Sequence, residues 1–164
     1  MPTTVRLRLD GPGVRAVAEL RSRVAAAGLP VASGIPHVTV AAAGTVPAAA
    51  VRELTAELRL VALPALWLAT LGSVTGDDDR LVLAAVTDPE VLAVHTAVHD
   101  ALAGRVRGVH AAHLPGSWLP HVVLATGRPA EAFALLHPVV PVRARIVAVE
   151  LHDSRTGEVM TLAG

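Results

Sequence analysis

The feature that most constrains this chain is a short motif that occurs twice. The segment IPHVTVA occupies positions 35–41, and LPHVVLA occupies positions 119–125. Segments rich in β-branched and apolar residues and bounded by Pro and Gly are typical of short strands. A motif repeated within one chain predicts two similar halves, each with a strand that carries a histidine, His37 or His121, toward a shared central cleft.

The surroundings of the two motifs repeat as well. In each half the sequence predicts a strand, a helix, the histidine strand, a second helix and a closing strand. The internal repeat covers about 4–72 and 80–152, within a single domain that spans 1–164. The expected strands besides the motifs are 5–9, 65–71, 81–86 and 143–151, and the expected helices are 12–27, 47–60, 89–103 and 129–136. This order predicts an α+β fold.

Charge and composition restrict the classes of partner. The chain of 164 residues has 14 basic and 14 acidic residues, a formal net charge of zero and no cysteine. Proteins that follow long nucleic acids usually carry a basic excess, so a long RNA or DNA track is disfavoured. The lack of cysteine excludes disulfides, thiolate catalysis and cysteine-bound zinc.

Neither a signal peptide nor a membrane segment is expected. The first ten residues alternate apolar side chains with Arg6 and Arg8, unlike the apolar core of a signal peptide. The longest uncharged stretch, 24–51, is interrupted by several Gly and Pro residues, so it cannot form one membrane-spanning helix. We therefore expect a soluble, cytoplasmic protein.

Strand geometry gives the two histidines a common chemical setting. Side chains alternate along a strand, so His37 and Thr39 share one face while Val38 and Val40 point to the other. Two imidazoles brought together can act as a general acid and a general base near neutral pH, without a metal. The alternative is that each histidine is a hydrogen-bonded core residue. The repetition in matched context favours the catalytic interpretation.

With these motifs the chain resembles the two-histidine phosphoesterases, a family that includes the bacterial 2′-5′ RNA ligases acting as RNA 2′,3′-cyclic phosphodiesterases. Its signature is two His-x-Thr/Ser-x motifs, and the likeness covers nearly the whole chain. Residues 36–40 fit the first motif, whereas Val123 stands where the second motif carries Thr or Ser. The resemblance implies two lobes of antiparallel-type sheet, with helices outside, around a central cleft.

The resemblance also implies roles for individual residues. His37 would be the acid for the leaving 3′-oxygen, His121 the base for water, and Thr39 a phosphate-binding hydroxyl. At Val123 that hydroxyl is missing, which puts catalytic strength or the usual substrate in question. Of the nearby residues, Trp118 is a candidate for stacking a nucleobase or for packing, and Arg128 for binding phosphate or for solvated charge.

The remaining candidates have simpler alternatives. His95 and His99 are spaced as ligands on one helical face, and His110 and His113 could add to a metal site. We favour the interpretation without a metal. The aspartates at 77–79 are expected to form a solvated turn, and Trp67 is expected in the core.

The sequence therefore predicts a phosphodiesterase, without metal or cofactor, that opens a 2′,3′-cyclic phosphate on a nucleoside or RNA end, with 2′-5′ ligation as a related reaction. One alternative is a non-catalytic or weakly catalytic module that binds phosphate or nucleotide. The other is a phosphodiesterase acting on a small molecule unrelated to RNA. The expected partner is a small nucleotide or an RNA terminus that bears a cyclic phosphate, and the oligomeric state is left open.

Overall fold

A computed structural model describes residues 2–74 and 79–164. Its helices are α1 (Gly11–Ala26), α2 (Ala48–Leu58), α3 (Pro89–Leu102) and α4 (Pro129–Leu136), with one 3₁₀ turn, η1 (Ala111–His113). Its strands are β1 (Thr3–Leu9), β2 (His37–Ala43), β3 (Ala65–Val74), β4 (Arg80–Ala85), β5 (His121–Thr126), β6 (Val142–Asp153) and β7 (Val159–Ala163). The α+β prediction is confirmed. The sequence did not predict β7 or η1.

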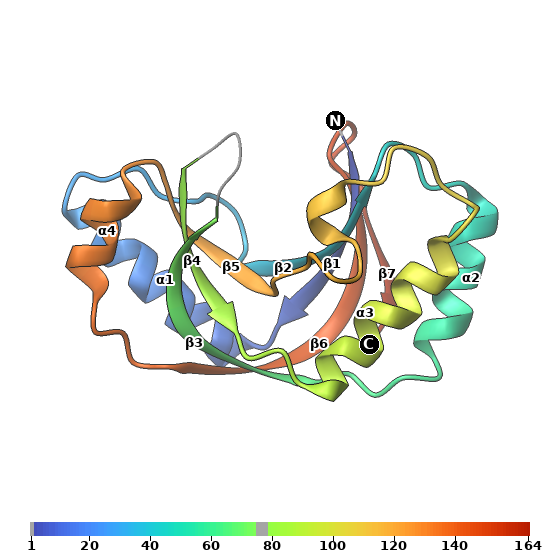
Figure 1. Ribbon diagram of the computed structural model, residues 1–164, viewed down its shortest axis with the longest axis horizontal. Helices are drawn as coiled ribbons and strands as arrows, with labels where there is room; N and C mark the ends of the chain where they lie inside the picture. Colours follow the sequence, from blue (N-terminus) through green and yellow to red (C-terminus); the bar gives the residue numbers. More distant parts are fainter. Residues whose placement is uncertain (1, 75–78) are drawn as a thin grey trace.

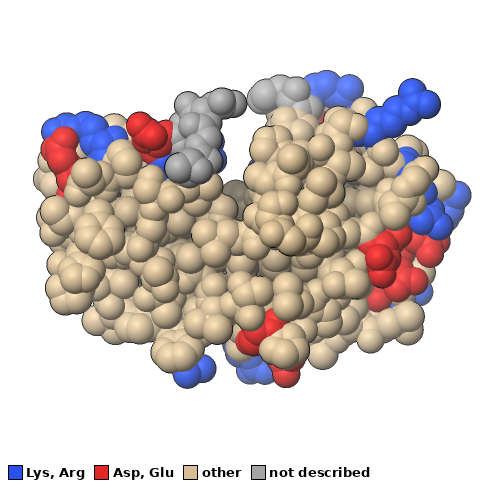
Figure 2. Space-filling view, in the orientation of Figure 1, with Lys and Arg blue, Asp and Glu red and all other residues tan. Residues whose placement is uncertain are grey.

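The described strands form one antiparallel sheet in the order β2-β1-β6-β3-β4-β5, with β7 added beside β6. The sheet bends so that its two edge strands, β2 and β5, come close to one another in the middle of the molecule (Figure 1). The helices α2 and α3 pack together near β7 and β2, whereas α1 and α4 pack together over β4 and β5. In the space-filling view the surface is hollowed between these two lobes (Figure 2).

The lobes do not coincide with the two halves of the sequence, because each half gives its closing strand to the other lobe. In the first half that strand is β3, which pairs with β4 of the second half. In the second half it is β6, which pairs along most of its length with β1 of the first half. The helices follow the same exchange, since α1 packs with α4 and α2 packs with α3.

The two halves nevertheless share local details. Asp10 and Asp88 each cap the helix that follows, accepting a hydrogen bond at 2.9 Å from the backbone N–H three residues later. Each histidine strand also carries an irregularity at the same place. The pairing of β1 with β2 shifts between Val5 and Arg6, and the pairing of β4 with β5 shifts between Leu81 and Val82. Bulges of this kind re-aim side chains, and here they do so equally in both halves.

The alternation of side chains along β3 determines which way Trp67 points. Its neighbours Leu66 and Leu68 are buried, so Trp67 points to the opposite face of β3 and is 44% exposed. The guanidinium of Arg143 lies 5.0 Å from its ring centre. The expectation that Trp67 belongs to the core was therefore wrong.

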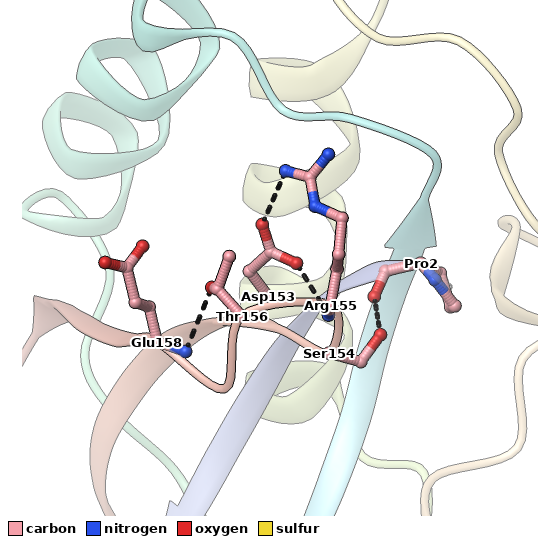
Figure 3. Close-up of polar contacts among 6 residues, drawn as sticks. All are labelled: Pro2, Asp153, Ser154, Arg155, Thr156 and Glu158. Carbon is pink, nitrogen blue, oxygen red and sulfur yellow. Dashed lines mark hydrogen bonds and ion pairs between the residues drawn. The ribbon is translucent and has the colours of Figure 1, made fainter.

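The turn between β6 and β7 is held by its own polar groups (Figure 3). Asp153 accepts hydrogen bonds from the backbone and the guanidinium of Arg155, at 2.8 and 3.1 Å. The hydroxyl of Ser154 donates to the carbonyl of Pro2, which ties the turn to the start of β1. After the turn β7 pairs antiparallel with β6, and its Leu162 is buried.

In the two described ranges of the chain, no helix combines the length and the apolar character needed to cross a lipid bilayer. Of the aspartates predicted to form a turn, Asp77 and Asp78 lie outside the described residues.

Candidate active site

His37 and His121 are the first residues of β2 and β5, and their rings are held in the same way. The Nδ1–H of His37 donates to the carbonyl of Ile35 at 2.9 Å, and that of His121 to the carbonyl of Leu119 at 2.7 Å. Because a carbonyl can only accept, each neutral ring carries its proton on Nδ1 and keeps the lone pair on Nε2. Both Nε2 atoms are thus prepared to exchange a proton with a ligand.

The alternation of burial agrees with the expected faces of the two strands. Val38, Val40, Val122 and Leu124 are fully buried, whereas the residues between them are partly exposed. Thr39 therefore shares the face of His37. Val123 shares the face of His121, as predicted, and presents a methyl group where Thr39 presents a hydroxyl.

Two side chains each connect one half of the chain to the histidine strand of the other half. Arg21 of α1 donates from Nε and Nη2 to the carbonyl of Val123, at 3.0 and 2.8 Å, and from Nη1 to the carbonyl of Gly34 at 2.8 Å. The indole N–H of Trp118 donates to the carbonyl of Thr39 at 2.9 Å. These bonds fix β2 and β5 next to each other, which is the arrangement that a shared site requires.

The surroundings keep both imidazoles neutral around pH 7. Burial, together with the smaller effects of Arg6, Arg21 and His152, lowers the pKa of His37 to about 4, against the opposing effect of the bond to Ile35. Burial also lowers the pKa of His121, assisted by Arg80. A bound anion would raise both pKa values, so a phosphate would itself promote protonation of the acid.

Directly paired residues of antiparallel strands point to the same face, so the pairing register identifies the side chains that lie beside each histidine. We call these two groups of side chains the His37 wall and the His121 wall. Arg8 stands opposite His37 and Arg6 opposite Thr39. At the equivalent places of the second half, Ala84 stands opposite His121 and Val82 opposite Val123. The His37 wall is therefore charged where the His121 wall is apolar.

Trp118 serves mainly to support the site. Its ring is stacked on that of His95, with ring centres 4.2 Å apart, and its N–H is used by Thr39. This arrangement corresponds to the packing interpretation. Stacking of a nucleobase on the other face of the indole stays a prediction.

Arg128 is exposed and lies beyond the end of β5, where it forms an ion pair with Glu131. Its Nε donates to the same carboxylate at 2.7 Å. A phosphate could take this guanidinium only in competition with Glu131, so the role of Arg128 in binding phosphate stays a prediction.

The histidines considered for a metal site make contacts with the backbone. His95 Nε2 donates to the carbonyl of His113 at 2.8 Å, and His99 Nε2 to the carbonyl of Val40 at 3.2 Å. Within the described part of the chain, no group of three or more His, Cys, Asp or Glu side chains is placed to hold a metal ion. His95 and His99 instead connect α3 to η1 and to β2.

The sequence interpretation missed Arg21 and His152 as parts of the site. His152 of β6 lies close enough to His37 to lower its pKa, although the two residues are far apart in the chain. The internal repeat contained a signal that could have identified Arg21. When α1 and α3 are aligned at their caps Asp10 and Asp88, Arg21 matches His99, and both donate to a carbonyl of the other half's histidine strand.

Comparison with solved structures identifies proteins of the same fold, whereas comparison with family models and curated proteins gives no match. No family model matches the chain, and no curated protein matches it either. Among solved structures, the MHV ns2 PDE domain superposes with a TM-score of 0.62 at 17% identity, covering 92% of this chain and 96% of that one. Usb1 of Kluyveromyces marxianus gives 0.60 at 13% identity, with coverage of 99% and 98%. The protein TT0787 of Thermus thermophilus gives 0.59 at 20% identity, with coverage of 100% and 99%.

These structures have the two-histidine phosphoesterase fold, and the likeness extends over nearly the full length of this chain. The resemblance found in the sequence is therefore confirmed at the level of the fold. Usb1 has also been solved with uridine monophosphate.

Proposed function

We propose that this chain is a phosphodiesterase that opens 2′,3′-cyclic phosphates of nucleosides or RNA ends by acid and base catalysis from His37 and His121. The observation that carries the proposal is the equivalent placement of the two imidazoles. Each begins an edge strand of the bent sheet, and each is anchored through Nδ1 to the carbonyl two residues earlier. Protonation of one of the two rings at Nε2 would give the one proton donor and the one proton acceptor that this reaction requires.

In the proposed step, His121 Nε2 takes a proton from water as the water oxygen bonds to phosphorus. The bond from phosphorus to the 3′-oxygen breaks, and protonated His37 gives its Nε2 proton to that oxygen. The product is a 2′-phosphate with a free 3′-hydroxyl. A 5′-hydroxyl of a second RNA in place of water would give a 2′-5′ linkage. Thr39 would donate a hydrogen bond to a phosphate oxygen, and no step requires a metal ion.

A second candidate is a module that binds a cyclic or terminal phosphate without efficient turnover. Val123 favours this alternative, because the second motif lacks the hydroxyl that its counterpart Thr39 offers. The lowered pKa of His37 also favours it, because little of the acid is protonated at neutral pH before a ligand binds.

One experiment separates the two candidates. The protein is incubated with a panel of nucleoside 2′,3′-cyclic phosphates, short RNAs ending in a cyclic phosphate, and cyclic phosphodiesters without a nucleoside, and the products are mapped by chromatography against 2′- and 3′-phosphate standards. Binding of the same compounds and of uridine monophosphate is measured by calorimetry. Turnover to 2′-phosphates supports the enzyme, and binding without turnover supports the module. Turnover confined to compounds without a nucleoside would replace RNA as the substrate class.

A further inference from the structure

The wall beside His37 continues past the histidine motif as a third row of side chains. Across β2, β1 and β6, the first row contains His37 and Arg8 and the second contains Thr39, Arg6 and Glu150. The next row on the same face contains Thr4 and His152. Successive rows on one face of a strand are about 6.8 Å apart.

Arg6 reaches from the second row into the third. Its Nε donates to the hydroxyl of Thr4 at 2.8 Å, which brings the guanidinium next to the row of His152. The neighbouring cation Arg8 is neutralised by Glu150, with 2.9 Å between Nη1 and Oε1. Glu150 also stands opposite Arg6 and interacts with its charge, so the wall carries two arginines against one carboxylate and keeps one positive charge in excess.

His152 adds an imidazole whose hydrogen bonding is incomplete. Among the described residues, its buried Nδ1 has no hydrogen-bond partner. A proton on this atom would be an orphaned buried donor, which is costlier than an unused lone pair. The tautomer that avoids this cost carries the proton on Nε2, so the ring has one N–H to donate.

The second half offers no such arrangement at the corresponding positions. Val82 replaces Arg6, Val74 replaces His152, and Gly72 replaces Glu150. Arg80 occupies the place of Thr4, opposite Thr126 near the end of β5. Arg6 and His152 thus both have apolar counterparts, Val82 and Val74, in the second half.

We propose that Arg6 and His152 form a subsite for a second anionic group of the substrate, about one row beyond the reacting phosphate. This inference rests on the proposed function of the histidine pair. The spacing is of the order of the distance between the phosphates on the two sides of one ribose. The preferred substrate class is therefore a nucleotide that bears a 5′-phosphate or 5′-phosphodiester as well as the cyclic phosphate, as a cleaved RNA end does, rather than a cyclic phosphate on an otherwise uncharged nucleoside.

The test compares kcat/KM for adenosine 2′,3′-cyclic phosphate with that for the same compound carrying a 5′-phosphate. A hydrogen bond to a charged group is worth roughly 1.5–3 kcal/mol, so the wild type should prefer the 5′-phosphorylated substrate by about 10- to 100-fold. Arg6→Met and His152→Phe should each bring this ratio close to one, and Arg6→Lys should restore part of it. Arg145→Met, an exposed arginine at the other end of β6, should keep the wild-type ratio.

Binding measurements test the subsite even if the protein hydrolyses neither substrate. If the wild type turns over neither substrate, the proposed function is wrong. The subsite is then tested by the ratio of the dissociation constants for adenosine 2′-phosphate and adenosine 2′,5′-bisphosphate. A preference for the bisphosphate that Arg6→Met and His152→Phe both lose supports it. A wild-type ratio near one, or a ratio that both variants retain while circular dichroism shows them folded, overturns it.

Discussion

Arg21 on α1 and Val123 on β5 are joined by two hydrogen bonds, from Nε and Nη2 to one carbonyl oxygen. This contact links a helix of the first half to the histidine strand of the second half. We expect Arg21→Met to lower the free energy of unfolding by roughly 1.5–3 kcal/mol, the usual worth of hydrogen bonds made by a charged group. Urea denaturation measures the loss. Arg15→Met, an exposed arginine on the same helix, should change stability by much less, and equal losses in the two variants would contradict this role for Arg21.

His37→Asn and His121→Asn should each reduce kcat on a cyclic phosphate by about 10²- to 10⁴-fold, because each removes one partner of the proton transfer. Circular dichroism should remain that of the wild type. His137→Asn, which changes an exposed histidine at the end of α4, is the matched control and should keep full activity. Dialysis against EDTA should change no rate. A loss with EDTA that zinc reverses would argue for a metal site instead of the histidine pair.

Val123→Thr tests whether the missing hydroxyl limits catalysis. The two side chains are nearly isosteric and Val123 is partly exposed, so the strand should keep its packing. If the new hydroxyl reaches the phosphate in the transition state, kcat/KM should rise by about 10- to 100-fold. The reverse change, Thr39→Val, should lower it by a similar factor. A folded Val123→Thr protein with unchanged turnover would mean that another group already holds that oxygen or that the substrate places none there.

The pH dependence of kcat/KM should be bell-shaped, with its maximum below pH 6.5. This parameter reports the free enzyme, in which His37 has a pKa of about 4 and the pKa of His121 is also lowered. The two limbs belong to the pair as macroscopic values. The profile of kcat should lie at higher pH, because bound phosphate raises both pKa values. Rates measured from pH 4 to 9 check this, and a maximum of kcat/KM above pH 7 would contradict it.

Stability should decrease as the pH falls from about 6.5 toward 4. Burial lowers the pKa of His37 and of His113 to about 4, so in this interval the unfolded chain binds protons that the folded chain does not. Urea denaturation at pH 7 and pH 5 measures the difference in unfolding free energy. The decrease should be smaller in His37→Asn and in His113→Gln than in the wild type. A wild-type protein that is equally stable at both values would show that these rings are not kept neutral by the fold.

Local patterns were sufficient to predict most elements of this fold. The alternation around His37 and His121 identified both histidine strands and the faces of their side chains, because period two is a property of the strand itself. The repeat extended this prediction to the order of strands and helices. β7 was missed because the first half has no counterpart to it.

The contacts that complete the site depend on pairing across the whole chain, which local patterns do not encode. The bond from Arg21 to Val123 depends on the packing of α1 against β5, and the approach of His152 to the His37 wall depends on the pairing of β6 with β1. The anchoring of each histidine ring on the carbonyl two residues earlier is local, but it depends on the backbone path before the strand. Trp67 shows the converse case. Its aromatic side chain led to the prediction of a core position, but the alternation of side chains along β3 places it on the exposed face.

The exchange of β3 and β6 has a consequence for the origin of such a molecule. Because each lobe takes its closing strand from the opposite half, a single half on its own would lack the strand that completes its sheet. Two copies of one ancestral half-length chain could supply that strand to each other, as a domain-swapped homodimer with twofold symmetry. Each copy would then bring one histidine strand to the place where β2 and β5 now meet. Fusion of the copies would free the two walls to diverge, one keeping or acquiring charge at Arg6 and the other becoming apolar at Val82.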